Sequence, residues 1–393
     1  SFLSVVSFTS VKRIVLISKH ALREFKVSFH DIQLFAAFLF FLLIPLKNTG
    51  IIHYVIWLGV IATTANIALT IYNNGAKRKY IVLFFVLLID IVVSLFTTDE
   101  PFESGLLYAI VCYFSLFWVI ALNNTFLQNK KTIDTVYRFG ILSGLLFSAY
   151  SLMPFAYYRD NNTVSPTLTL YFGNSNLAGI YIFAVICIVM IYLKNARKKA
   201  FVVILVTYLL YLLWMTGART CMIAAIFVVA SAILPIKIRI PKMIVALCFA
   251  FPILFVPMYL MLFRSGYADL MIMGKSLFSG RQGTFTDYLS LLRTNFQWIV
   301  GNLGEASFAN AHNAPLAHLC STGLLGTILF YGMMLKKTMA CCENDNPVAR
   351  TALICILGLF IQSSGEASIF LGGFPGIEFV YVLFYLAGRK EPL

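Results

Sequence analysis

The chain contains 393 residues, of which 60% are hydrophobic and only 12% are charged, and its mean hydropathy is +0.86. Soluble domains average about 25% charged residues, so this composition excludes a soluble globule. The formal net charge of +14 raises the question of a nucleic-acid partner, which the distribution of the charges answers below.

The first segment, residues 1–30, carries lysines and arginines among apolar residues such as Val11, Ile14 and Leu16. This pattern predicts a basic amphipathic helix that lies on the cytoplasmic surface of a membrane. We expect no cleavable signal sequence in it.

About twelve long apolar runs follow. A helix needs about 20 apolar residues to cross about 30 Å of hydrocarbon, whereas a β-barrel would show ten-residue segments of alternating hydropathy. The runs are unbroken, so the expected fold class is an all-α polytopic membrane protein. The runs lie near 32–47, 51–72, 80–97, 105–123, 136–155, 175–193, 200–215, 219–235, 242–263, 312–335, 350–364 and 370–388.

The runs divide the chain into four parts. The basic segment 1–30 comes first, and residues 31–263 hold the first nine predicted spans. Residues 264–311 form an extracytoplasmic loop, and residues 312–393 hold the last three spans and a short cytoplasmic tail.

Charge predicts the orientation. With the N-terminus in the cytoplasm, most lysines and arginines fall on the inner side, as the positive-inside rule requires. Both termini are then cytoplasmic, and the membrane accounts for the basic charge without nucleic acid. Seven cations remain on the outer side, namely Lys47, Arg159, Arg219, Arg264, Lys275, Arg281 and Arg293. Five of them are arginine, whose planar fork binds phosphate in a bidentate way that lysine cannot reproduce.

The long outer loop is predicted to hold one amphipathic helix over the mouth of the bundle. Its apolar residues recur at steps of three and four, and Arg281 precedes it between Gly280 and Gly283. The apolar residues are Phe285, Tyr288, Leu289, Leu292, Phe296 and Ile299. A helix that merely lies among lipid headgroups is the alternative, just as Arg219, after Gly217, is either a ligand-binding or a snorkelling arginine.

His312 and Asn313 begin the tenth predicted span in the stretch "NAHNAPLAHLCSTGLLG". A neutral imidazole is the usual base at neutral pH, although a histidine at a helix entrance is also a common capping group. His318 is six residues further on and faces elsewhere on the helix, and the glycines of "GLLG" favour close helix packing.

Acidic and cysteine residues give weaker indications. The sequence "TTDEPFESG" places Asp99, Glu100 and Glu103 in one outer loop, which is either a solvated turn or, less favoured, a site for a divalent ion. Asp90 lies within a predicted span and is expected to bond a neighbouring helix. The eight cysteines show no metal-ligand spacing, and we expect neither a disulfide nor a metal site.

Five motifs occur in a fixed order along the chain: "GNSNLAG", "TGART", "SGRQGTF", "GNLG" and "AHNAPLAHLCSTGLLGTI". Together with the long outer loop between the ninth and tenth spans, they resemble the O-antigen ligase and polymerase superfamily of bacterial envelope polysaccharide enzymes. The resemblance covers roughly residues 30–388 and is strongest over 174–326. It implies a glycosyltransferase fold similar to class C.

The resemblance also implies an activity. Such enzymes move a glycan from an undecaprenyl-diphosphate carrier to an acceptor hydroxyl on the outer face of the bacterial cytoplasmic membrane, without a metal or other cofactor. It assigns the catalytic role to His312 and diphosphate binding to Arg219 and Arg281, with Arg264 as a third candidate. Asn313, Asn176 and Glu366 are the supporting residues that it implies.

Three functions remain open at this point. A polymerase would join O-antigen or capsular repeat units from lipid-linked donor and acceptor glycans, in some cases with a chain-length regulator, and base rates in the family favour it. A ligase would instead use lipid A-core, giving lipopolysaccharide, or another terminal acceptor. A polysaccharide or lipid flippase would also fit twelve spans, but it predicts two related halves, and these halves look unalike.

Overall fold

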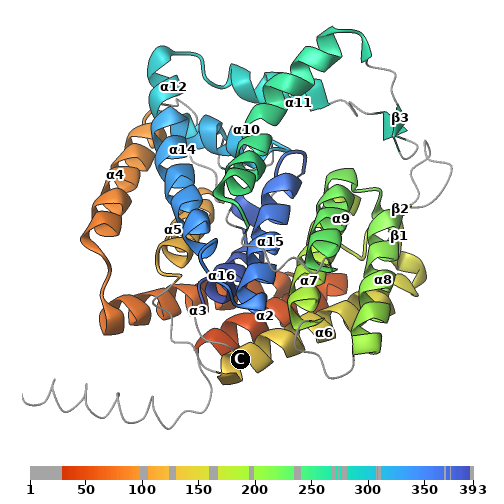
Figure 1. Cartoon of the computed structure of the whole chain (residues 1–393). Coiled ribbons are helices and arrows are strands. Elements are labelled where there is room, and N and C mark those ends of the chain that lie inside the picture. The colour runs from red at the N-terminus through yellow and green to blue at the C-terminus, as the bar shows by residue number, and fades with distance from the viewer. Residues whose placement is uncertain are drawn as a thin grey trace, which may run out of the picture.

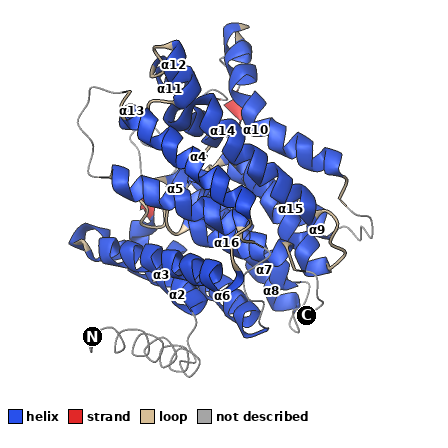
Figure 2. Cartoon of the chain, turned by 90° about the vertical axis from the view of Figure 1, so that its left-hand side faces the viewer, coloured by secondary structure: helices blue, strands red, loops and turns tan. Residues whose placement is uncertain are grey.

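The computed structural model describes residues 29–97, 105–123, 130–158, 167–193, 199–233, 240–267, 271–272, 275–276, 281–306, 308, 311–366, 369–371 and 373–389. Most of these residues are helical (Figures 1 and 2). The predicted amphipathic helix of the N-terminal segment, up to residue 28, lies outside the described residues, as does the acidic loop with Asp99, Glu100 and Glu103.

Helices occur at every one of the apolar runs. In chain order they are α2 (Phe29–Leu43), η1 (Ile44–Thr49), α3 (Ile51–Asn74), α4 (Arg78–Leu95), α5 (Leu106–Ala121), α6 (Lys130–Ser151), η2 (Pro154–Ala156), α7 (Ser175–Leu193), α8 (Lys199–Thr216), α9 (Arg219–Ile233), α10 (Lys242–Arg264), α11 (Arg281–Ser290), α12 (Asn295–Val300), α13 (Leu303–Ala306), α14 (Ala314–Cys341), α15 (Pro347–Gln362), η4 (Ile369–Leu371) and α16 (Gly376–Ala387). The strands among the described residues are two short antiparallel pairs, β1 (Tyr157–Tyr158) with β2 (Thr167–Leu168) and β3 (Met271–Ile272) with β4 (Lys275–Ser276).

Length and hydropathy single out part of this set as membrane spans. Six of the described helical segments are long enough and apolar enough to cross a membrane: His30–Thr49, Ile51–Asn74, Ser175–Leu193, Lys199–Thr216, Lys242–Arg264 and Ala314–Cys341. Four shorter apolar helices accompany them: α5, α9, α15 and α16. The expectation of an all-α membrane protein is therefore confirmed, while the number of twelve spans stays a prediction.

Apolar packing holds the bundle together around α7, α15 and α16. Nearly every residue of α7 and α16 is buried, because these helices are enclosed by protein on all sides rather than on one face. Figures 1 and 2 both place α11 and α12 at one end of the bundle. The long loop predicted at residues 264–311 therefore lies at this end of the bundle.

The long helix α14 is broken at Gly323, whose φ of 60° and ψ of −169° are open to glycine alone. The backbone groups released by the break find partners on two other elements. The Asn302 amide donates to Cys320 O (2.7 Å), and Ser94 Oγ donates to Ser321 O (2.8 Å). A broken helix is tolerated at membrane depth only when its backbone is bonded in this way.

Gly323→Ala is expected to destabilise the protein strongly. A Cβ at this position would lie 2.2 Å from Ile299 O, and the backbone conformation alone costs a non-glycine residue about 1–3 kcal/mol. Thermal unfolding of the detergent-purified protein measures the effect. Gly332→Ala, in the same helix and with nothing within 4 Å of the new Cβ, is the matched control. Equal unfolding midpoints for the two variants would contradict the described break.

The expected hydrogen bond from Asp90 to a neighbouring helix was a wrong prediction. Asp90 is buried in α4, but neither carboxylate oxygen accepts a hydrogen bond from any described residue, so the predicted bond to a neighbouring helix is not formed. The carboxylate lies instead against Gly326 of α14, where a Cβ would come within 2.5 Å of Asp90 Oδ2. Gly326 thus does permit the close packing that "GLLG" indicated. All eight cysteines lie among the described residues and are free.

Candidate functional site

The segment of the long loop that was predicted to form one amphipathic helix forms two helices, α11 and α12. The helix α11 ends at Ser290 and α12 begins at Asn295. The interruption has a local cause, because Thr294 and Gln297 form a capping box that starts a new helix. Gln297 Oε1 accepts from the Thr294 amide (3.1 Å) and from the Arg293 amide (2.8 Å).

Only the first half of the predicted apolar face is packed. Phe285 of α11 is fully buried, with its ring 5.3 Å from that of Tyr259 in α10. Phe296 of α12 is 53% exposed. The helix α11 is therefore anchored to the bundle, and its first residue, Arg281, is fixed with it.

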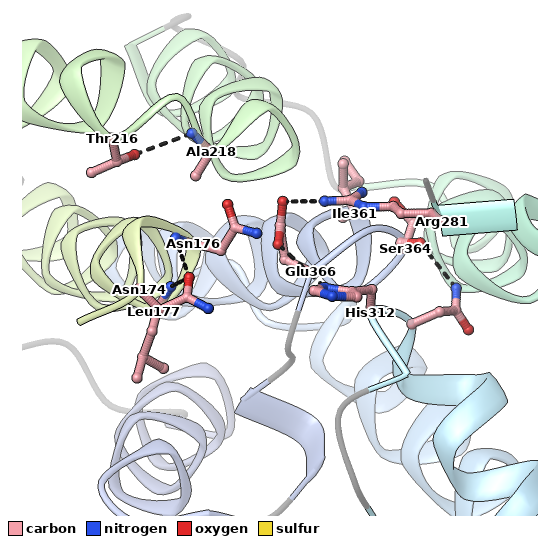
Figure 3. A network of polar contacts seen from close by, with 11 residues as sticks. Asn174, Asn176, Leu177, Thr216, Ala218, Arg281, His312, Ile361, Ser364 and Glu366 are labelled. Carbon is pink, nitrogen blue, oxygen red and sulfur yellow. Dashed lines mark hydrogen bonds and ion pairs between the residues drawn. The ribbon is translucent and has the colours of Figure 1, made fainter. Parts of the chain in front are cut away.

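Glu366 stands at the centre of the candidate site (Figure 3). Its Oε1 atom lies 2.5 Å from Arg281 Nη2, and its Oε2 atom lies 3.8 Å from His312 Nδ1. The carboxyl side chain is 2% exposed, whereas the side chains of Arg281 and His312 are 13% and 28% exposed. The carboxylate is thus enclosed between a cation and an imidazole that both reach the surface.

Asn313 ties together the segments that carry these residues. Its Nδ2 donates to Pro252 O of α10 (2.8 Å) and to Ser364 O of the turn after α15 (3.0 Å). Its Oδ1 accepts from the Leu316 amide (2.8 Å), so it is also the N-cap of α14. His312, directly before it, has a positive φ of 54°, which turns the chain into the site. The buried Asn313 side chain therefore links α10, α14 and the turn after α15.

Arg219 reaches the same end of the bundle from α9. Gly217, with φ 65°, makes the turn out of α8, and Thr216 Oγ1 accepts from the Ala218 amide (3.2 Å). The half-buried Arg219 is close enough to interact electrostatically with Arg281, Glu366 and Tyr259. Arg219 and Arg281 come from distant parts of the chain, and both therefore lie near Glu366.

Asn176 lies in the first turn of α7. The side chain of Asn174 orders this turn, because its Oδ1 accepts from the Asn176 amide (2.8 Å). In Figure 3 the amide group of Asn176 points toward the carboxylate of Glu366. Asn176 thus lies on the side of Glu366 that faces α7.

Arg264 does not join this group in the part of the chain that the structure describes. It is the exposed last residue of α10, five residues beyond Tyr259. Five residues advance a helix by about 7.5 Å and turn it by about 140°, so Arg264 leaves the helix on a different side. No contact that we observe links it to Glu366, Arg281 or His312, which weakens its assignment as a diphosphate ligand.

Sequence reasoning missed two site residues. Tyr259 interacts electrostatically with both Arg219 and Arg281, but a tyrosine inside an apolar run carries no distinctive signal. Gln362, the last residue of α15, is fully buried and bonds Cys221 of α9. A lone amide at the end of an apolar run is a signal that could have identified it.

Gly365→Ala is expected to cripple any activity of this site while leaving the fold intact. The new Cβ would lie 2.8 Å from Arg281 Nη1 and 2.6 Å from Thr220 Cγ2, so the guanidinium must move off Glu366. Gly373→Ala is the control, since its Cβ would meet nothing within 4 Å. Turnover by the purified variants measures both effects, and unchanged turnover in Gly365→Ala would contradict a functional role for the Arg281 position.

The arrangement suits an anionic ligand and a proton transfer. Two arginines supply fixed positive charge, and a carboxylate faces Nδ1 of the histidine. No three histidine, cysteine, aspartate or glutamate side chains come together as metal ligands within the described ranges.

No family model, curated protein or solved structure matches this chain. The geometry of the site therefore carries the functional argument.

Proposed function

We propose that the protein is a membrane glycosyltransferase that moves a glycan from an undecaprenyl-diphosphate carrier to a hydroxyl of an acceptor glycan. The observation that carries the proposal is Glu366, which contacts Arg281 with one oxygen and faces His312 with the other. Anion binding and proton transfer are the two tasks of this reaction, and this cluster holds the groups for both.

The arginines stabilise the leaving group. Negative charge builds up on the diphosphate as the glycosidic C–O bond breaks, and fixed guanidinium groups in a partly dry site stabilise that charge. Arg219 and Arg281 lie close enough to interact electrostatically with each other, and we expect both to contact the diphosphate. Their mutual repulsion is relieved when a diphosphate binds between them.

His312 activates the acceptor hydroxyl. Its neutral imidazole takes the proton of the attacking hydroxyl. Glu366 faces Nδ1, so a proton on Nδ1 leaves Nε2 as the base, as in other sites where a carboxylate orients a catalytic histidine. The distance of 3.8 Å is longer than a hydrogen bond, and catalytic contacts of this kind commonly shorten when substrate binds.

Glu366 also has a role before the donor binds. A buried carboxylate without a partner would be costly, and the ion pair with Arg281 avoids this. The diphosphate then competes with Glu366 for Arg281. Release of the carboxylate from Arg281 frees it to support His312.

The proposal includes twelve spans, with both termini in the cytoplasm and the site on the outer face of the bacterial cytoplasmic membrane. Part of the support comes from the helices present at every apolar run. The rest comes from the cations that lie on the predicted inner side.

Within this reaction class we favour a polymerase of O-antigen or capsular repeat units over a ligase. Both use the same donor chemistry, and they differ in the acceptor. A transporter is the alternative of another class. The polar cluster at one end of the bundle favours an enzyme, since transport sites lie near the middle of the membrane.

Turnover by the purified protein tests the function. We expect the protein in liposomes to act on an undecaprenyl-diphosphate-linked oligosaccharide and to give a ladder on a gel, with the same yield in the presence of EDTA. Transfer only to added lipid A-core would indicate a ligase. Loss of product with EDTA would contradict the metal-independent mechanism, and donor that is moved across the bilayer without transfer would support a transporter.

A further inference from the structure

Three helices turn polar side chains toward one another on the far side of the bundle. On each helix these side chains are spaced by three or four residues, so they form one stripe. We call them the α2–α3–α16 seam: His30 and Gln33 of α2, Thr63, Asn66 and Thr70 of α3, and Glu378, Tyr381 and Tyr385 of α16. An apolar bundle has no structural need for so many buried polar groups.

The contacts at Glu378 favour a protonated carboxyl group. Thr63 Oγ1 lies within hydrogen-bond distance of both Gly59 O (2.8 Å) and Glu378 Oε1. A threonine hydroxyl has only one hydrogen, so it can serve only one of these two oxygens at a time. A protonated carboxyl group carries its own hydrogen, and with it both contacts are hydrogen bonds at once.

The surroundings of Glu378 support this state. Its side chain is fully buried, and no described lysine or arginine forms an ion pair with it. An unpaired carboxylate in such a place is far more costly than a neutral acid. Glu378 Oε2 has no hydrogen-bond partner among the described residues.

His30 lies at the other end of the seam. It is 5% exposed, and both ring nitrogens lack a hydrogen-bond partner among the described residues. Its ring centroid is 5.1 Å from that of Tyr381, and Tyr381 bonds the side chain of Asn66. Asn66 Nδ2 in turn donates to Gln33 Oε1 (2.8 Å). Polar groups thus continue from His30 to the turn that holds Glu378.

The end of the seam at His30 lies far from the candidate transfer site. The helix α15 ends next to Glu366, whereas its beginning lies beside the end of α16, where Asn344 Nδ2 donates to Ala387 O (3.2 Å). The sixteen residues of α15 span about 24 Å. His30, which packs near Tyr385 (6.1 Å between ring centroids), therefore lies at the end of the bundle opposite Glu366.

We propose that the α2–α3–α16 seam is a proton-binding site, in which Glu378 holds the proton against Thr63. This site is independent of the transfer reaction. Several other titratable groups face the seam or lie on helices packed against α16. They are Asp31 of α2, which accepts from Thr135 Oγ1 (3.0 Å), Tyr381 and Tyr385 of α16, Tyr108 and Cys112 of α5, and Arg350 and Cys355 of α15.

Infrared spectroscopy of the full chain in liposomes tests the proposal, because a protonated carboxyl group has a C=O stretching band that a carboxylate lacks. We expect Glu378→Gln to lose this band at neutral pH, and Thr63→Val to shift it by removing the acceptor. Glu343→Gln, at an exposed glutamate, and Asp90→Asn should both retain it. A band that is unchanged in Glu378→Gln and in Thr63→Val would overturn the proposal.

A change of cation tests which ion the seam binds. Loss of the band when sodium replaces choline in the buffer would overturn the proton site in favour of a sodium site, whereas an unchanged band supports the proton site.

Discussion

Replacing His312 should reduce glycan transfer at least about 100-fold, which is the usual cost of losing a general base. His312 has a positive φ, so alanine adds backbone strain to the chemical loss. His312→Asn separates the two effects, because asparagine tolerates this conformation but cannot accept the proton. We expect both variants to lose product in the liposome assay, and His312→Asn to keep the thermal stability of the wild type.

His53 provides the matched control. It is an exposed histidine at the start of α3, outside the candidate site. His53→Asn should therefore transfer glycan at the wild-type rate. Substantial turnover in His312→Asn would rule out His312 as the base.

Arg281→Lys and Arg219→Lys should each lower turnover by about 100-fold, the order of loss seen when one charge-stabilising donor is removed. Both variants keep the positive charge and, for Arg281, a cation next to the buried Glu366. What they lose is the planar fork that binds phosphate through two parallel hydrogen bonds. The effect should appear in kcat, because the charge on the diphosphate grows in the transition state.

Arg293 and Arg264 are the controls for these substitutions. Arg293 is exposed and pairs with Glu305 (3.0 Å), and Arg264 is exposed at the end of α10. Lysine at either position should leave turnover within about twofold of the wild type, because a surface ion pair contributes at most about 1 kcal/mol. Full activity of both Arg219→Lys and Arg281→Lys would refute the diphosphate assignment.

The helical positions could be predicted from the sequence because length and hydropathy determine them. The break in α14 could not, since its cause is a contact between Gly323 and Ile299 O of α12, which is a matter of tertiary packing. The division of the long loop into α11 and α12 could be predicted only in part. Thr294 and Gln297 have the spacing of a capping box, but the apolar periodicity across them was the stronger pattern.

Part of the candidate site could likewise be predicted from the sequence, and part could not. Arg219, Arg281 and His312 stood out as polar residues on the predicted outer side, and the structure brings Arg281 and His312 to the same carboxylate. The position of Glu366 between them depends on how the turn after α15 meets α14, as in the bond from the Ala314 amide to Ser363 O (3.1 Å). No local pattern in the sequence encodes that contact.

Asn313 illustrates how a cap and a site residue coincide. A histidine and an asparagine before a helix suggest capping, and Asn313 does cap α14. The same side chain also bonds α10 and the turn after α15. Capping thus accounts for Asn313, while the neighbouring His312 faces Glu366.

A density map of the protein with bound undecaprenyl diphosphate tests the central claim most directly. The proposal requires phosphate density against the guanidinium groups of Arg219 and Arg281, with Glu366 released from Arg281 and closer to His312 Nδ1 than the present 3.8 Å. Phosphate bound elsewhere on the bundle, with the Arg281–Glu366 pair undisturbed, would show that this cluster is not where the carrier binds.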